Sequence, residues 1–356
     1  MSDNQNYHNL QGVDMYESLV SADLDKELRK IACSEKVNYN THQGTVALGM
    51  AMFFSDPKIA KFLIEAGVQI DKDKDFLLYA AIAGSSLENI KLLVKEGADP
   101  HKFDEDGITT LMSASQSSDD EIFDYFLNIG VDPLLVSKSN KTALHFVSSL
   151  VTFGKPNNSF KRFKLLIEKG CDPLLIDNKG ESILHLSAEA GNSEIFFAAI
   201  DMGLDIFAVT KSGDTLLHSA AYGGNEKIFN FLLDKKLDVF AKNNDDFTVL
   251  HKATYTYLKS DNIISKLLDM GLDPLLKTKN GQHSLHFACR KLNKENITRM
   301  IKMGCNMHDK DSNGSDCFDY ALDETIEEFL KKQNNKKRFN DMLFKFFNMF
   351  ALFEKK

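Results

Sequence analysis

Histidine and cysteine are the side chains in this 356-residue chain whose spacing could support metal or acid–base chemistry. The densest group is His283, His286 and Cys289, each three residues from the next. Imidazole and thiolate are common zinc ligands. Positions three apart on a helix nevertheless rotate steadily away from one another. A structural role for these residues is therefore favoured over a metal site.

Other chemical signatures are missing from the sequence. It contains no GxGxxG, Walker, GxSxG, HExxH or CxxC pattern, and these patterns mark nucleotide, nucleophile and metal sites. The sequence therefore predicts no catalytic residue, no metal and no cofactor. An enzyme with an unrecognised site is retained as the second alternative to a binding function.

The remaining conspicuous histidines belong to a repeat. The pattern T/S-x-L-H ends at residues spaced 40, 33, 33 and 35 apart, namely His145, His185, His218, His251 and His286. Histidines separated by whole repeats cannot converge on one ion. A period near 33 instead predicts one supersecondary unit stacked many times.

Each unit carries signals for a turn and two helices. A residue suited to positive φ comes first, at Gly107, Asn140, Gly180, Gly213, Gly281 and Gly314. A helix N-cap follows two residues later, at Thr109, Thr142, Ser182, Thr215, Thr248 and Asp316. The second helix ends at a glycine, which in four units is followed by Asp-Pro, as at Asp132-Pro133.

These residues resemble the ankyrin repeat family, in which a β-turn precedes two antiparallel helices. The resemblance implies an all-α ankyrin-repeat solenoid of helix-turn-helix units with short β-turn or hairpin connections, about eight or nine units including degenerate ones. It also implies that the His286 ring hydrogen-bonds within the turn that starts its helix. The domains expected are a flexible N-terminus (1–18), the solenoid with degenerate end caps (19–330) and a C-terminal helix (331–356).

Departures from the family pattern concern the first units and one insertion. Residues 40–70 and 71–100 are read as degenerate repeats. The proline usual after the capping threonine is missing throughout. Residues Val151 to Ser159 lengthen one unit and are interpreted either as a plain surface loop or as part of a binding surface.

Docking of partner proteins on a concave surface is the function that the resemblance implies, with no enzyme activity. Apolar pairs follow the helix stop and could anchor a partner: Leu134-Leu135, Leu174-Leu175, Ile206-Phe207 and Leu275-Leu276. Their recurrence in register favours the alternative that they pack between neighbouring repeats.

The C-terminal segment supplies a different hypothesis. Residues 331–356 carry a net charge of +6, which leaves residues 1–330 at −14 because the whole chain carries −8. A helical arrangement would place Phe339, Leu343, Phe346, Phe350 and Phe353 on one side, after the basic residues Lys336, Lys337 and Arg338. Such a helix could bind an anionic membrane or a partner groove, or pack on the last repeat. The first alternative function is therefore a membrane-tethered regulator.

Composition sets the remaining expectations. The acidic array argues against nucleic acid as a partner. No apolar stretch is long enough for a transmembrane span, and the five scattered cysteines suggest no disulfide framework. A cytoplasmic protein with possible peripheral membrane contact is expected. Rare arginine and abundant asparagine indicate an AT-rich genome. Together with the ankyrin array, this composition resembles the effectors that intracellular bacteria secrete into eukaryotic hosts.

Overall fold

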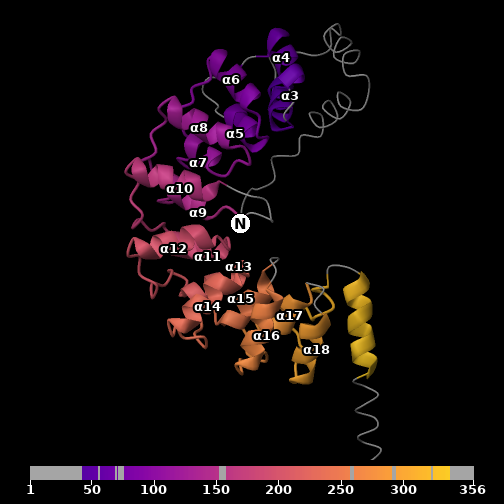
Figure 1. Cartoon of the computed structure of the whole chain (residues 1–356). Coiled ribbons are helices and arrows are strands. Elements are labelled where there is room, and N and C mark those ends of the chain that lie inside the picture. The colour runs from indigo at the N-terminus through magenta and orange to yellow at the C-terminus, as the bar shows by residue number, and fades with distance from the viewer. Residues whose placement is uncertain are drawn as a thin grey trace, which may run out of the picture. The chain divides into compact units, whose positions relative to one another are not determined.

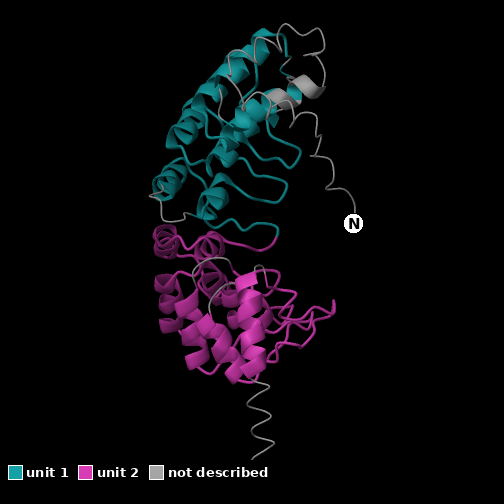
Figure 2. Cartoon of the chain, turned by 90° about the vertical axis from the view of Figure 1, so that its right-hand side faces the viewer, with its two compact units in different colours: residues 1–178 teal, residues 179–356 magenta. Residues whose placement is uncertain are grey.

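The structure consists of helices joined in pairs (Figure 1). The computed structural model describes residues 42–54, 57–68, 70, 76–151, 158–256, 260–290, 294–321 and 324–336. The chain divides into two compact units, residues 1–178 and 179–356 (Figure 2). Apart from isolated β-bridges, the described residues form no strand. The predicted all-α class of paired helices is therefore confirmed.

Each unit contains four helix pairs among its described residues. In the first unit the pairs are α3 (His42–Phe53) with α4 (Pro57–Glu65), α5 (Phe76–Ala83) with α6 (Leu87–Lys95), α7 (Thr110–Ala114) with α8 (Asp120–Asn128), and α9 (Ala143–Ser148) with α10 (Ser159–Glu168). In the second they are α11 (Ile183–Glu189) with α12 (Ser193–Asp201), α13 (Leu216–Gly223) with α14 (Glu226–Asp234), α15 (Val249–Tyr255) with α16 (Asp261–Asp269), and α17 (Ser284–Ala288) with α18 (Lys294–Lys302).

The first helix of a pair begins at the predicted cap. Thr109, Thr142, Ser182, Thr215 and Thr248 all occupy the N-cap position. At α17 the cap position is held by His283, which the sequence did not indicate. Asp316 caps a turn, because its carboxylate accepts the Phe318 N–H at 2.8 Å, and residues 317–320 form turns rather than a helix.

The hairpins between helix pairs are held in register by backbone hydrogen bonds. Within the second unit, the N–H of Lys211 donates to the Lys179 carbonyl at 2.8 Å and that of Asn244 to the Ser212 carbonyl at 2.8 Å. All the predicted turn residues have positive φ. Asp246, with φ 61°, takes this place in a hairpin that lacks glycine. Aspartate adopts positive φ more readily than most other residues with a side chain, so it can hold this turn in place of glycine.

Second helices bury one apolar side and expose the other. Phe123 and Phe126 of α8 are fully buried in the first unit, and Phe196 and Phe229 are fully buried in the second. The residue directly after the C-cap of a second helix adopts positive φ, as Gly130 does after α8 and Gly170 after α10. Lys236, with φ 60°, ends α14 in the same way without a glycine.

First helices pack most closely where α13 meets α11. A Cβ added at Gly223 would lie 1.9 Å from the carbonyl oxygen of Ala188 and 2.9 Å from that of Glu189. Real Cβ atoms do not approach backbone oxygen so closely, and the opposing atoms belong to backbone rather than to a flexible side chain. Gly223 therefore allows the C-terminal ends of α11 and α13 to lie side by side.

Replacing Gly223 by alanine is expected to lower the free energy of unfolding by roughly 2 kcal/mol, because overpacking outweighs the gain in helix propensity. Gly49→Ala is the control. Its Cβ would meet the ring of Phe76 at 2.7 Å, and that ring is 42% exposed and can swing away. Urea denaturation of both variants checks this expectation, which equal midpoints would contradict.

The last described helix covers the end of the second unit. Residues 324–336 are helical, and Ile326 and Leu330 on this segment are buried. Gln333 Nε2 donates to Thr298 Oγ1 on α18 at 3.4 Å, and the Lys294 ammonium lies 5.7 Å from the Phe329 ring centroid. Residues 331–336 thus continue the helix that packs on α18.

Candidate partner-binding surface

The apolar pairs predicted as partner anchors are divided between surface and interior. Leu134, Leu174, Phe207 and Leu275 are exposed, with Leu174 and Phe207 at 63% and 64%. Leu135 is also exposed, whereas Leu175, Ile206 and Leu276 are half-buried. The alternative that these pairs pack between neighbouring repeats therefore applies only to Leu175, Ile206 and Leu276. The role of these residues in partner binding stays a prediction.

A second exposed position lies two residues further along each hairpin. It is occupied by Phe103, Val136, Ile176 and Val209, all exposed. Bridges pair Phe103 with Thr109 and Val209 with Thr215, so these segments are extended. Side chains two apart on an extended segment point the same way. This alternation was readable in the sequence as apolar residues two apart, but the sequence analysis grouped adjacent residues instead.

Within each unit, these side chains form what we call the hairpin row. Its members are Phe103, Leu134, Val136, Leu174 and Ile176 in the first unit and Phe207, Val209, Phe240 and Leu275 in the second. In each unit the hairpins project to one side of the helix pairs (Figure 2). Because a water-exposed apolar side chain gains from burial, rows of this kind are typical of surfaces that bind other proteins.

Another set lies at or just after the C-terminal ends of the first helices of the second unit, and we call it the inner-helix row: Glu189, Tyr222, Tyr255 and Arg290. These residues take the same place in successive repeats, four residues after the histidine of the T/S-x-L-H pattern. The Tyr222 and Tyr255 ring centroids lie 6.3 Å apart, and the Arg290 guanidinium lies 5.6 Å from the Tyr255 centroid. The sequence analysis did not identify this row.

An ion pair lies beside the inner-helix row. Lys252 Nζ is 2.9 Å from Asp214 Oδ2, and Asn243 Nδ2 donates to Asp214 Oδ1 at 2.8 Å. Burial opposes ionisation of Asp214, but the Lys252 ammonium and these hydrogen bonds hold its pKa below the usual value. Asp214 is therefore a fully compensated carboxylate.

Glu189 is compensated much less. The Ser219 hydroxyl donates to Glu189 Oε1 at 3.2 Å. Burial and the negative charges of Glu181 and Asp214 raise the pKa of Glu189 to about 7, although Lys252 and the Ser219 hydrogen bond act in the opposite direction. Near neutral pH this carboxyl group consequently exchanges between protonated and ionised forms.

The repeated histidines perform a structural task. The Thr215 N–H donates to His218 Nδ1 at 3.2 Å, so Nδ1 is an acceptor and the proton is on Nε2. His218 Nε2 then donates to the Phe247 carbonyl of the next hairpin at 3.0 Å. His251 makes the same bond to the Leu276 carbonyl at 3.0 Å. The neutral rings of His218 and His251 therefore link their own helix starts to the following repeat.

In the group His283, His286 and Cys289, the His286 ring makes the same two kinds of bond. The His283 N–H donates to His286 Nδ1 at 3.2 Å, and His286 Nε2 donates to the Asp309 carbonyl at 2.9 Å. Cys289 is buried at the C-cap of α17. Across the described ranges, no group of three or more His, Cys, Asp or Glu side chains could hold a metal ion.

Comparison with known proteins identifies the repeat. A family model described as "Ankyrin repeats (3 copies)" matches residues 77–152, 149–243 and 184–278, which together span more than half of the chain. The chain belongs to the ankyrin repeat family. An ankyrin repeat protein of Acanthamoeba polyphaga mimivirus is 28% identical over 215 residues, which cover 52% of this chain. The chain spans only 28% of the length of that relative.

Membership of the ankyrin family agrees with the histidine geometry and with the role that the resemblance implied for His286. Ankyrin repeats generally mediate protein–protein interactions and are generally non-enzymatic. Within the described part of the chain, no helix is long and apolar enough to cross a membrane. The cysteines Cys171, Cys289, Cys305 and Cys317 are buried.

Two predicted features of this ankyrin protein fall largely outside the described residues. Lys336 is exposed at the end of the last helix, but Lys337, Arg338, Phe339, Leu343, Phe346, Phe350 and Phe353 lie beyond it. Residues 152–157 of the insertion are also outside the described residues. Their assigned roles stay predictions.

Proposed function

We propose that this protein is a non-enzymatic scaffold that binds partner proteins through the hairpin row and the adjoining first helices. The observation that carries the proposal is the hairpin row itself. It places exposed apolar side chains at equivalent positions of successive repeats, and burying each large apolar side chain against a partner contributes about 1.5–3 kcal/mol. The family's general role in protein–protein interaction supports the same conclusion.

Phe207→Ser is expected to reduce binding of the principal partners at least tenfold, because aromatic anchors dominate interface energetics. The matched control is Met270→Ser, since Met270 is 40% exposed but lies at the end of a second helix. The full chain and both variants serve as baits for eukaryotic cell lysate, with quantitative mass spectrometry of the bound proteins. Unchanged partner recovery with Phe207→Ser would count against the proposal.

The remaining sequence-based hypotheses concern context. Segregation of basic residues into 331–356 supports the alternative of a membrane-tethered regulator. The arginine-poor composition supports an effector that acts in a eukaryotic host cell and resides in its cytoplasm. Both proposals are compatible with a scaffold, because they concern the place in the cell where the protein acts and not the surface that binds the partner.

A further inference from the structure

Glu189 is the carboxylate of the inner-helix row, and it is compensated less than the neighbouring Asp214. It lies at the C-terminal end of α11 and is half-buried. Among the described residues, the Ser219 hydroxyl at 3.2 Å is its hydrogen-bond donor. A partly buried carboxylate with one neutral donor costs folding free energy, because desolvation is not repaid by a cation.

The cation that acts on Glu189 is already engaged. Lys252 Nζ lies 2.9 Å from Asp214 Oδ2, and it also lies 5.6 Å from the Phe247 ring centroid. Ser212 adds a further hydrogen bond to Asp214 Oδ2 at 3.0 Å. Of the charges that act on Glu189, those of Glu181 and Asp214 are negative, and the positive one, Lys252, is bound to Asp214.

An aromatic ring lies next to this carboxylate. Tyr222 follows Glu189 in the inner-helix row, and Gly223 brings the C-terminal ends of their two helices together. The next ring of the row, Tyr255, already has the Arg290 guanidinium 5.6 Å from its centroid. The tyrosine one repeat after Tyr222 thus already has a cation over its ring. Cation–π contacts of this kind are made by Arg and Lys side chains.

We propose that Glu189 and the Tyr222 ring bind a lysine or arginine side chain of the partner protein. Charge complementarity selects this occupant, because a basic side chain would neutralise the local excess of carboxylates while its aliphatic stem covers the tyrosine. The inference rests on the proposed function and specifies the chemistry of the partner. The hairpin row would bind the apolar residues of the same partner.

The first test is selection of peptides from a displayed random library on the full-length protein near pH 8, where Glu189 is mostly ionised given its pKa of about 7. Enriched peptides are expected to share a Lys or Arg at one position. Glu189→Gln is expected to weaken binding of a synthesised peptide at least tenfold. Glu194→Gln, at an exposed acid in the first turn of α12, is expected to leave it unchanged.

The pH dependence gives a second readout. A bound cation lowers the Glu189 pKa, so affinity is full above about pH 7 and falls up to tenfold per pH unit below it. The other titratable groups that act on Glu189 are Glu181, Asp214, Tyr222 and Lys252. The pKa of Asp214 is lowered, so Asp214 stays ionised near pH 7 and does not contribute to the pH dependence there. Glu189→Gln is expected to abolish the dependence.

Stability separates this role from a structural one. Because the folded-state pKa of Glu189 is raised, its ionisation opposes folding above about pH 7 and has no effect near pH 4.5. Glu189→Gln should therefore raise the melting temperature at pH 8 while it weakens peptide binding. If Glu189 were instead needed for the fold, the same substitution would lower the melting temperature as well as weaken peptide binding.

The outcomes separate the two proposals. Enriched peptides without a basic preference, or equal affinity for the original and Glu189→Gln proteins, would overturn the inference and leave the scaffold proposal standing. Selection that yields no peptide dependent on Phe207 would contradict the scaffold proposal and the inference with it.

Discussion

Acidification from about pH 6.5 to about pH 4 is expected to remove most of the stability of the helical stack, because buried imidazoles must then accept protons. Burial lowers the pKa of His145, His251 and His283 to about 4. In His145 and His251, protonation would also convert Nδ1 from acceptor to donor, and so break its bond from the N–H of Thr142 or Thr248.

The expected loss follows from linkage. Each of these histidines binds a proton near pH 6.5 when unfolded but only near pH 4 when folded, so stability is complete above pH 6.5 and falls as the pH drops. At about 1.4 kcal/mol per pKa unit, one histidine contributes up to roughly 3 kcal/mol. Three such groups are comparable with the 5–15 kcal/mol that typically stabilises a domain, so unfolding is expected at about pH 4–5.

Denaturant titrations at a series of pH values, followed by circular dichroism, provide the measurement. Glu189 acts in the opposite direction, because its raised pKa favours folding as the pH falls from 7 to 4.5. His251→Gln is expected to be less stable at neutral pH but to depend on pH less steeply by about one proton. A free energy of unfolding that stays constant between pH 6.5 and 4.5 would show that the rings are not held neutral by burial.

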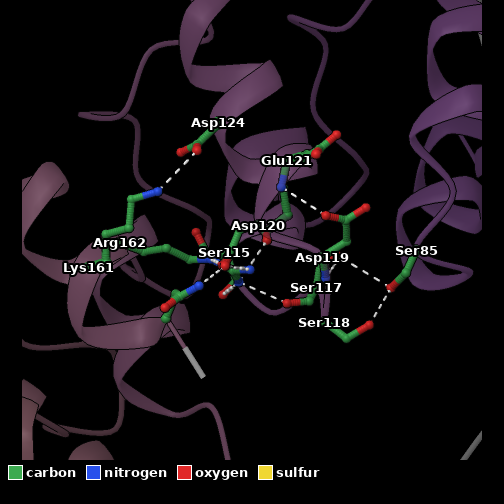
Figure 3. Close-up of polar contacts among 12 residues, drawn as sticks. Ser85, Ser115, Ser117, Ser118, Asp119, Asp120, Glu121, Asp124, Lys161 and Arg162 are labelled. Atoms are coloured by element: carbon green, nitrogen blue, oxygen red, sulfur yellow. Dashed lines mark hydrogen bonds and ion pairs between the residues drawn. The ribbon is translucent and has the colours of Figure 1, made fainter. Parts of the chain in front are cut away.

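Arg162→Met is expected to destabilise the first unit by about 3 kcal/mol, because it removes the cation from a buried network. Arg162 of α10 is 3% exposed. Its Nε and Nη2 donate to Asp120 Oδ1 at 3.0 and 2.6 Å, and Nη1 donates to the Ser115 and Ser117 carbonyls at 3.0 and 2.9 Å (Figure 3). The variant leaves those carbonyls without a donor after α7.

Lys161→Met supplies the matched control. Lys161 precedes Arg162 on α10, and its Nζ lies 3.3 Å from Asp124 Oδ2 (Figure 3). Both side chains of that pair are well exposed, and surface ion pairs contribute at most about 1 kcal/mol. Urea denaturation of the two variants should differ clearly in midpoint. Equal midpoints would mean that the Arg162 bonds do not contribute to stability.

The repeat signals predicted much of the fold because they act locally. A capping Thr, a turn residue with positive φ and an Asp-Pro pair each specify the backbone within a few residues. The prediction failed where tertiary structure overrides local preference. Lys236 adopts positive φ, a conformation that lysine does not favour, and His283 occupies a cap position usually held by Thr or Ser.

The candidate site was less predictable because it depends on neighbours far along the chain. Arg162 bonds to carbonyls 45 and 47 residues away, and nothing next to it in the sequence indicates them. Glu189 and Tyr222 become neighbours only when successive repeats are stacked. Exposure of Leu174 and burial of much of Leu175 follow from the extended backbone of the hairpin, which adjacent apolar letters do not reveal.

Site-specific photo-cross-linking tests most directly whether partners dock on the hairpin row. A photoreactive phenylalanine analogue would replace Phe207, which is 64% exposed, in the full chain, and in a second protein it would replace Met270, which is 40% exposed. Illumination in eukaryotic cell lysate is expected to attach specific proteins at position 207 and not at position 270. Cross-links at position 270 alone, or equal patterns at both positions, would contradict the assignment of this surface to partner binding.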